Sequence, residues 1–382
     1  MGEIKRWSGN ATTEISLYDN ELDQLVEFVN AHGEIYIYGK GRIGTALGHY
    51  CKQAGIHIDG YIISEEWETF KKKYNPYKTV IVMGVGDSSM EEIRAIIDPV
   101  VKLEDIFTLS SHKRESMGNV FSKKEIEEKF WINIYVTNHC NLNCASCSAF
   151  APICKPDYYD VEQFQKDLKQ IKKLQLTHIT AFKFTGAEAL LHPNIFEMFK
   201  IARREIKDGW VECYTNGIIL LKMKDEQLQL IKEYNVTLVI TEYPVEIINY
   251  EHVYKRLKDL GVKYEVIYSD GTKYFSQRPL NFDKSTAKHL FYYCPRYKMC
   301  NSLFLFNGRL YKCIYALSAT YFNEAFATEL EVMPQDYLDI YKISKEEVYQ
   351  YCINRIPFCG YCSPIEKKVE WRLSERKIQE WT

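Results

Sequence analysis

Cys140-Asn-Leu-Asn-Cys144-Ala-Ser-Cys147 places three cysteines within eight residues. The segment follows residues 132–136, an apolar run with the length of a buried strand. Thiolates select zinc or an iron–sulfur cluster, and three local ligands leave one coordination position open. The stretch therefore predicts a metal centre with an open position, which favours catalysis over a closed structural site. A zinc knuckle completed by His139 or by a distant cysteine is the alternative.

Strands and helices are expected to alternate regularly downstream of this point. The expected strands are 132–136, 178–184, 210–214, 237–242 and 263–268, and the expected helices between them are 161–174, 194–204, 225–233 and 247–260. Such alternation builds a parallel sheet and here suggests a barrel. Barrels of this kind carry functional residues on loops after the carboxyl ends of strands, which is where the cysteine triplet lies.

Further motifs follow the next three strands. They are Thr185-Gly-Ala-Glu-Ala-Leu-Leu191, Tyr214-Thr-Asn-Gly217 and Thr241-Glu-Tyr-Pro244. In this order, after a C-x3-C-x2-C triplet, they resemble the radical S-adenosylmethionine (SAM) enzymes over residues 130–362. The resemblance implies a [4Fe–4S] cluster held by Cys140, Cys144 and Cys147, with SAM on the fourth iron. One electron, from a donor such as flavodoxin or ferredoxin, would cleave SAM to a 5′-deoxyadenosyl radical that abstracts hydrogen from the substrate.

The same resemblance implies particular SAM contacts. Gly186 and Glu188 match the family's G-G-E-P-L-L loop, which holds the amino group of SAM, and Asn216 belongs to a T-N-G step common in the family. Many members carry an aromatic residue at the position of Ser146, and we expect Phe150 to replace it. Two alanines also replace the second glycine and the proline of the G-G-E-P-L-L loop. These departures leave open a barrel that keeps its cluster but has lost SAM cleavage.

Six cysteines punctuate the region after residue 282: Cys294, Cys300, Cys313, Cys352, Cys359 and Cys362. Residues 300–313 predict a hairpin that brings its end cysteines together, and Cys359-Gly-Tyr-Cys362 adds a C-x2-C pair. Spacing alone fits a zinc ribbon and a second cluster equally well. The region is similar to the twitch form of the SPASM/twitch tails of radical SAM proteins. That likeness implies one auxiliary [4Fe–4S] cluster on Cys313, Cys359, Cys362 and either Cys294 or Cys300.

A glycine-rich loop, Gly39-Lys-Gly41-Arg-Ile-Gly44, lies between an expected strand at 35–38 and an expected helix at 43–54. This is the context of a dinucleotide fingerprint, whose glycines let a pyrophosphate reach the helix N-terminus. Its acidic partner is expected at Glu65 or Glu66. Tight packing of helix on sheet is the alternative reason for the glycines. The segment also resembles small Rossmann-like domains of bacterial carbohydrate-modifying enzymes, which implies a nucleotide or nucleotide-sugar ligand.

Composition excludes several classes of protein. The chain has 382 residues, with 49 Lys and Arg against 51 Asp and Glu, so its formal net charge of −2 argues against a nucleic-acid partner. Hydrophobic residues make up 46%, which is typical of a folded protein, yet no apolar run is long enough to span a membrane. The first residues lack a secretory signal pattern, and the twelve cysteines then favour metal or redox roles. We expect a cytoplasmic protein.

We therefore predict an α/β protein with four segments. These are a Rossmann-like domain with a parallel sheet at 1–115, a linker at 116–128, a partial (β/α)6 radical SAM barrel at 129–281 and a small, cysteine-rich, twitch-like domain at 282–382. The linker prediction rests on the polar composition of residues 110–123.

The predicted function is that of a radical SAM oxidoreductase or epimerase. Its expected substrate is a nucleotide-linked sugar that it dehydrogenates or epimerises during polysaccharide biosynthesis, because twitch and SPASM relatives act on alcohols, sugars and peptides. One alternative is a radical SAM enzyme that matures a peptide. The other is a non-catalytic zinc-binding protein.

Overall fold

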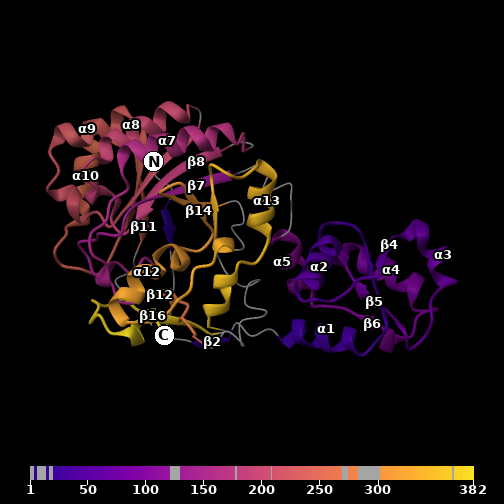
Figure 1. The fold of residues 1–382 in the computed structure, drawn as a ribbon. Coiled ribbons are helices and arrows are strands. Elements are labelled where there is room, and N and C mark those ends of the chain that lie inside the picture. Colours follow the sequence, from indigo (N-terminus) through magenta and orange to yellow (C-terminus); the bar gives the residue numbers. More distant parts are fainter. Residues whose placement is uncertain are drawn as a thin grey trace. The chain divides into compact units, whose positions relative to one another are not determined.

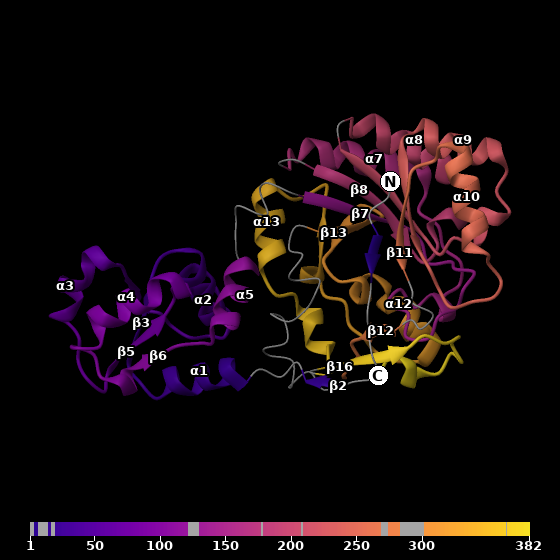
Figure 2. The same ribbon diagram turned by 180° about the vertical axis from the view of Figure 1, so that it is seen from behind.

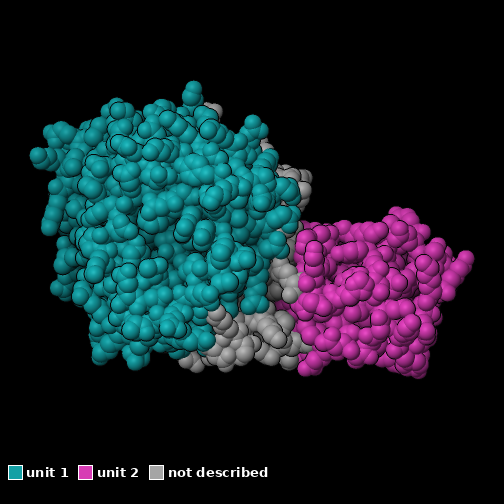
Figure 3. Space-filling model, viewed as in Figure 1, with its two compact units in different colours: residues 1–16, 126–287, 301–382 teal, residues 17–125, 288–300 magenta. Residues whose placement is uncertain are grey.

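The computed structural model describes residues 4–6, 14–16, 20–120, 130–176, 179–207, 209–268, 274–282, 302–363 and 365–382. These residues fall into two compact units, drawn in separate colours in Figure 3. The larger unit contains the cysteine triplet, and the smaller unit contains the glycine-rich loop. Each unit has its own parallel sheet and its own buried apolar residues.

Within its described residues, the larger unit is built on a nine-stranded sheet of order β1-β11-β10-β9-β8-β7-β13-β14-β15. The strands are β1 (Ile4–Arg6), β7 (Phe130–Thr137), β8 (Ile179–Gly186), β9 (Trp210–Thr215), β10 (Val236–Thr241), β11 (Tyr264–Tyr268), β13 (Ser302–Phe306), β14 (Arg309–Tyr311) and β15 (Tyr337–Asp339). Neighbours from β1 to β13 pair in parallel, whereas β14 pairs antiparallel with β13 and with β15. The carboxyl ends of the parallel strands therefore meet at one edge.

Four helices cover one face of this sheet, and α12 (Ile314–Phe326) lies on the other side (Figures 1 and 2). The four are α7 (Val161–Lys173), α8 (Ile195–Glu205), α9 (Asp225–Glu233) and α10 (Tyr250–Leu260). Buried residues three or four positions apart, such as Leu168 and Ile171 of α7, form the face that each helix turns to the sheet. The predicted mixed α/β fold with a parallel sheet is thus confirmed, and the elements expected between 132 and 268 differ from the observed ones by at most three residues.

The larger unit also includes residues that the sequence assigned elsewhere. Strand β1 pairs in parallel with β11, and β2 (Glu14–Ser16) joins β12 (Tyr274–Gln277) and β16 (Ile365–Glu370) in a small antiparallel sheet. The expectation of an N-terminal domain from residue 1 placed these strands in the wrong unit. Three-residue strands carry no periodicity by which sequence reasoning finds them.

The predicted C-terminal domain is not a separate unit either. Strand β13 pairs with β7, where Asn133 Nδ2 donates to Ser302 Oγ at 2.6 Å. On α7, the fully buried Asp167 accepts hydrogen bonds from Gly308 N and from the Tyr341 hydroxyl, both at 2.6 Å. The described residues from 302 to 382 therefore belong to the same compact unit as strands β7 to β11 and extend their sheet. Their remaining helix is α13 (Lys345–Ile353).

The smaller unit has a four-stranded sheet of order β4-β3-β5-β6 in its described residues. The strands, all parallel, are β3 (Glu34–Tyr38), β4 (Gly60–Ile62), β5 (Thr79–Met83) and β6 (Ile106–Phe107). The helices are α1 (Asn20–Asn30), α2 (Arg42–Gln53), α3 (Trp67–Lys71), α4 (Asp87–Ile97) and α5 (Ser111–Val120). The expected parallel α/β pattern is present.

Helix α5 corrects the linker prediction, because residues 111–120 of the polar stretch are helical. The prediction took the polar side chains as the sign of a linker, whereas polar contacts hold α5 in place. The buried Arg114 guanidinium donates to the Leu109 carbonyl and pairs with Asp87. A Cβ at Gly118 would lie 3.0 Å from Ile43 of α2, which shows how closely the two helices pack. Residues 121–129 lie outside the described residues. In the part of the chain that is described, no helix has both the length and the apolar character needed to cross a membrane.

We predict that Asp167→Asn destabilises the larger unit. The carboxylate also accepts from Gln163 Nε2 at 2.7 Å and from the Tyr159 hydroxyl, and an amide nitrogen would face some of these donors. Buried donors left without an acceptor cost about 2 to 4 kcal/mol of unfolding free energy. Urea denaturation measures the change. Asp160→Asn is the matched control: Asp160 caps α7 from an exposed position, and asparagine caps equally well, so an equal loss in both variants would contradict the prediction.

Candidate active site

The cysteine triplet lies in the loop directly after β7, at the carboxyl edge of the parallel sheet. Cys140, Cys144 and Cys147 line one cavity. Its other walls come from the ends of the next three strands: Thr185, Gly186 and Ala187 at β8, Tyr214, Thr215 and Asn216 at β9, and Thr241 and Tyr243 at β10. The cavity therefore lies where the sequence places the loops that carry functional residues, at the carboxyl ends of the strands.

The donor set of the cavity consists of soft ligands. No histidine or carboxylate is among the described residues that line it. Burial raises the pKa of the Cys140 thiol to about 12 and raises the pKa of Cys147, so metal binding must displace their protons. Cys140 Sγ accepts hydrogen bonds from Leu142 N at 3.4 Å and from Asn216 Nδ2 at 3.9 Å. Among the described residues, no three His, Cys, Asp or Glu side chains form a group that would hold a single metal ion.

Gly186 brings the loop after β8 against the triplet loop. Its φ is +125°, and a Cβ there would lie 2.3 Å from the Thr137 carbonyl oxygen. The neighbouring Ala187 donates its backbone N–H to the same carbonyl at 2.9 Å. Only glycine allows this approach without strain, so residue 186 adds no side chain to the cavity wall.

Glu188 lies behind this wall, and it is not among the residues that line the cavity. The fully buried carboxylate accepts hydrogen bonds from Asn216 N at 2.8 Å and from Leu190 N at 3.3 Å. Burial raises the pKa of Glu188 to about 7, although these hydrogen bonds act against the rise. Glu188 thus links the loop after β8 to the end of β9 and positions Asn216 beside Cys140. Its expected contact with SAM stays a prediction.

Phe150 packs among aromatic residues of the core. Its ring is fully buried and stacks on Tyr315, with centroids 5.3 Å apart and planes at 12°, and it also packs against Phe322 and Trp381. It is absent from the described residues that line the cavity. A buried core aromatic and a ligand-stacking aromatic look alike in sequence, and the expected contact of Phe150 with SAM stays a prediction.

The aromatic residues that do line the cavity are Tyr214 and Tyr243. Sequence reasoning quoted both within motifs and singled out neither as a site residue. The pKa of Tyr243 is raised well above its ordinary value by burial first, and then by the charges of Cys144 and Cys147. Its position directly after a strand that ends at the site is the signal that would have identified it.

The tail cysteines lie on segments fixed by buried charges. Cys313 caps α12, while Cys359 belongs to the 3-10 helix η9 (Pro357–Tyr361) and Cys362 follows it. The buried Lys312 ammonium donates to the carbonyls of Cys352 and Asn354, and the buried Asp336 carboxylate accepts from Phe358 N at 2.7 Å. The segments that carry Cys313 and Cys359 are therefore anchored to their neighbours. Cys294 and Cys300 lie outside the described residues.

Tyr315 connects this region to the triplet loop. It stands two residues after Cys313, and it stacks on Phe150, which donates its backbone N–H to the Cys147 carbonyl at 3.0 Å. Burial raises the pKa of Tyr315, and the charges of Cys362 and Cys313 raise it further. Both tail thiols thus lie near Tyr315, one stacked ring away from the triplet loop.

In the smaller unit, the glycines of the loop between β3 and α2 differ in what they do. Gly39 has a φ of +106°, and a Cβ on Gly44 would lie 1.9 Å from the Gly39 carbonyl oxygen. Tight packing accounts for these two glycines. Gly41 has an ordinary φ of −73°, and a Cβ there would meet no atom within 4 Å. Lys40 in the loop pairs with Glu66 at 3.8 Å, which places one of the two expected acidic residues beside it.

Comparison with known proteins gives a family match over residues 134–269, described as the radical SAM superfamily. A 7,8-dihydro-6-hydroxymethylpterin dimethyltransferase of Methanocaldococcus jannaschii is 29% identical over 115 residues, 29% of this chain and 21% of that protein. A GTP 3′,8-cyclase of Chlorobaculum tepidum is 32% identical over 103 residues, 27% of this chain and 29% of that protein. The chain spans between 21% and 34% of the length of the curated relatives it matches.

Solved structures give a low similarity. BtrN in complex with AdoMet and 2-DOIA aligns with 57% of this chain and 81% of its own, at 15% identity and a TM-score of 0.37. Native anSMEcpe with bound AdoMet aligns with 42% of this chain and 46% of its own, at 17% identity and a TM-score of 0.31.

The family match begins within β7, includes the cysteine triplet and ends directly after β11. That family implies a [4Fe–4S] cluster and SAM. The chain therefore contains a radical SAM superfamily domain at residues 134–269.

Proposed function

We propose that the protein is a radical SAM enzyme whose cluster is held by Cys140, Cys144 and Cys147. The observation that carries the proposal is the cavity that these three thiols share with the ends of β8, β9 and β10. Three soft ligands, without a histidine or carboxylate among the described lining residues, fit an iron–sulfur cluster with one open iron. The family match over the same residues supports the proposal.

The bound group would supply reductive cleavage of SAM to a 5′-deoxyadenosyl radical. The residues of the chain would hold the cluster and set its reduction potential. The N–H groups of Leu142 and Asn216 donate to Cys140 Sγ, and hydrogen bonds to cluster sulfur stabilise added negative charge. The glycine at position 186 would leave room for SAM at the cavity wall, and the rings of Tyr214 and Tyr243 would exclude water from the reacting atoms.

An auxiliary [4Fe–4S] cluster is proposed for the tail. Its ligands would be Cys313, Cys359, Cys362 and either Cys294 or Cys300, in a twitch-like arrangement. Two facts support it: Cys313 stands two residues before Tyr315, which stacks on Phe150 after the triplet, and buried Lys312 and Asp336 anchor the segments that carry Cys313 and Cys359. With an electron donor such as flavodoxin or ferredoxin, two clusters would serve oxidation or epimerisation of an alcohol carbon.

The proposed substrate is a nucleotide-linked sugar. Gly41 supports it, because neither its φ nor the space around it requires glycine. A loop at a helix N-terminus that is kept free of side chains suits a phosphate group. A nucleotide phosphate would bind at this loop of the smaller unit.

The first prediction from this proposal concerns iron content. Protein purified and reconstituted without oxygen should contain about eight irons per chain and no zinc. Cys144→Ala should lower the count to about four and abolish formation of 5′-deoxyadenosine from SAM and dithionite. Cys154→Ala is the matched control, since this nearby thiol donates a hydrogen bond to the Phe150 carbonyl and is assigned to neither cluster. Zinc without iron, or SAM cleavage that survives Cys144→Ala, would sink the proposal.

Gly186→Ala should impair SAM binding. The new Cβ would be forced against the Thr137 carbonyl oxygen, in a conformation that alanine rarely adopts. We expect SAM affinity, measured by equilibrium dialysis on the reconstituted protein, to fall at least about tenfold. Ala187→Gly changes the adjacent residue without adding an atom and should bind SAM normally. Equal affinities in the two variants would count against a backbone wall that holds SAM.

Gly41→Ala tests the nucleotide site. Because a Cβ at Gly41 meets no protein atom, the variant should melt like the wild type, yet UDP should bind about tenfold more weakly as the methyl group enters the phosphate path. Gly33→Ala is the control: it adds a methyl group elsewhere in the smaller unit, at an ordinary contact distance of 3.4 Å from Lys78 Cγ, and should bind UDP like the wild type. Isothermal titration measures the affinity of both variants for UDP. Absent UDP binding, or binding that Gly41→Ala leaves unchanged, would contradict the nucleotide proposal.

A further inference from the structure

Residues 372–382, here called the strap, contact every residue from Asn143 to Cys147. Leu373 forms an antiparallel bridge with Cys144, and on either side of it Ala145 N donates to the Arg372 carbonyl and Ser374 N donates to the Asn143 carbonyl, both at 2.9 Å. Farther along the strap, Ser146 Oγ donates to the Glu380 carbonyl at 2.8 Å and Trp381 Nε1 donates to the Cys147 carbonyl at 2.9 Å.

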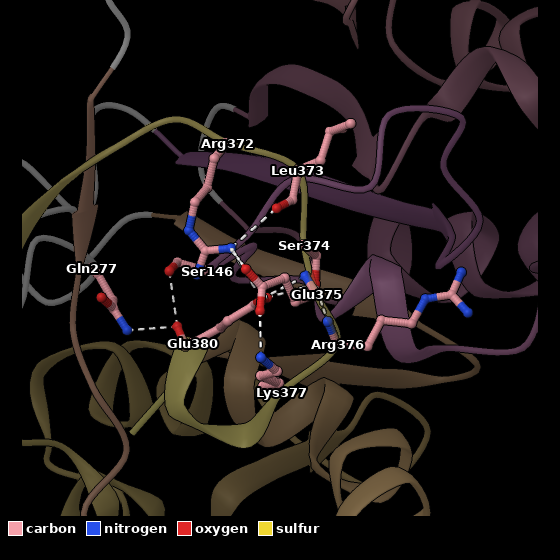
Figure 4. A network of polar contacts seen from close by, with 9 residues as sticks. All are labelled: Ser146, Gln277, Arg372, Leu373, Ser374, Glu375, Arg376, Lys377 and Glu380. Atoms are coloured by element: carbon pink, nitrogen blue, oxygen red, sulfur yellow. Dashed lines mark hydrogen bonds and ion pairs between the residues drawn. The ribbon is translucent and has the colours of Figure 1, made fainter.

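Glu380 gives the strap its shape. Its carboxylate, in a residue only 4% exposed, accepts hydrogen bonds from Ser374 Oγ at 2.5 Å and from Glu375 N at 2.6 Å, and it lies 3.4 Å from the Arg372 guanidinium (Figure 4). Gln277 Nε2 of β12 donates to the Glu380 carbonyl at 2.6 Å. The buried carboxylate thus folds the strap back on itself, so that its first residues contact 143–145 and its last residues contact Ser146 and Cys147.

The triplet loop depends on contacts from outside itself. Asn143 and Ser146 both have a left-handed backbone, with φ of +52° and +58°. Residues other than glycine pay a conformational cost there, and surrounding structure must offset it. The strap bonds to the carbonyl of one of these residues and to the hydroxyl of the other.

Trp381 adds a packed wall to these hydrogen bonds. Its ring is 1% exposed and packs edge-on against Phe150, with ring centroids 6.0 Å apart. Phe150 in turn donates its backbone N–H to the Cys147 carbonyl, so one carbonyl is held by both residues. The strap therefore fixes the backbone of Cys147 and covers this side of the loop.

We propose that the strap is part of the cluster site and that Glu380 and Trp381 are positioning residues for the cluster held by the triplet. This inference rests on the proposed function, because it requires a cluster at the triplet. Loss of a residue that holds a metal ligand in place without itself contacting the metal lowers the affinity for the metal about 10- to 100-fold. The strap acts in this way through the peptide groups of the ligands rather than through their side chains.

The test uses the reconstituted full-length protein and three variants. Glu380→Gln weakens the acceptor that folds the strap, Trp381→Phe removes the donor to Cys147, and Ser146→Ala removes one hydroxyl. The matched control is Glu375→Gln, a carboxylate in the same segment that is 58% exposed and pairs with Lys377. Transfer of iron to a chelator should be about 10-fold or more faster in Glu380→Gln and Trp381→Phe, about threefold faster in Ser146→Ala and within about twofold of wild type in Glu375→Gln.

A redox titration followed by electron paramagnetic resonance separates positioning from a loss of stability. The midpoint potential of the triplet cluster should rise in Trp381→Phe and stay unchanged in Glu375→Gln, since water that enters stabilises the reduced, more negative cluster. Unchanged potentials together with wild-type iron release in all variants would overturn the strap proposal and leave the proposed cluster intact. If Glu380→Gln does not fold, the other two variants decide the same question.

A second measurement does not require iron. In the iron-free protein, the amide hydrogens of Ala145 and Ser374 should exchange slowly with solvent and exchange faster in Trp381→Phe. Fast exchange at both amides in the wild type would overturn the strap proposal. If Cys144→Ala leaves the iron content unchanged, the proposed cluster fails, and the strap fails as a cluster-positioning device with it.

Discussion

The parallel pairing of β7 with β8 is the constraint on which the site depends. It sets Thr137 opposite Gly186 at the carboxyl edge of the sheet, and Ala187 N donates to the Thr137 carbonyl. The two strand ends approach as closely as backbone atoms allow, because a Cβ at position 186 would collide with that carbonyl. The triplet loop and the loop after β8 therefore leave the sheet side by side. Glu188 continues the edge to the end of β9 through its bond to Asn216 N.

The tail is a structural part of this arrangement rather than an appended module. Strand β13 extends the sheet from β7, and Asp167 on α7 holds the turn at Gly308. Aromatic packing then joins the two groups of cysteines, since Phe150 follows the triplet and Tyr315 follows Cys313. Packed rings and a backbone hydrogen bond thus form a continuous set of contacts between the tail and the triplet loop.

Sequence reasoning found what periodicity and local motifs encode. The strands and helices between 132 and 268 follow from alternating apolar runs, and the shared cavity of the three cysteines follows from strand ends that meet at one edge. It missed contacts that have no local pattern. The contacts between residues 143–147 and the strap join groups more than two hundred positions apart, and those between Asn143, Cys144 and Ala145 and residues 372–374 are made by backbone groups, which any sequence offers. The role of Phe150 toward SAM stays a prediction, because hydrophobic pattern does not separate packing against protein from packing against a ligand.

The three glycines of the loop in the smaller unit form one motif in the sequence, but the structure gives them different roles. A fingerprint of three glycines suits both phosphate binding and tight helix packing, so the pattern alone does not choose between them. Gly39 needs its positive φ, and residue 44 must be glycine because the Gly39 carbonyl fills the space that a Cβ would need. Packing explains both glycines without a ligand. Gly41 has neither requirement. The argument for a phosphate-bearing ligand therefore rests on this single position, where a side chain is absent although the protein itself has room for one.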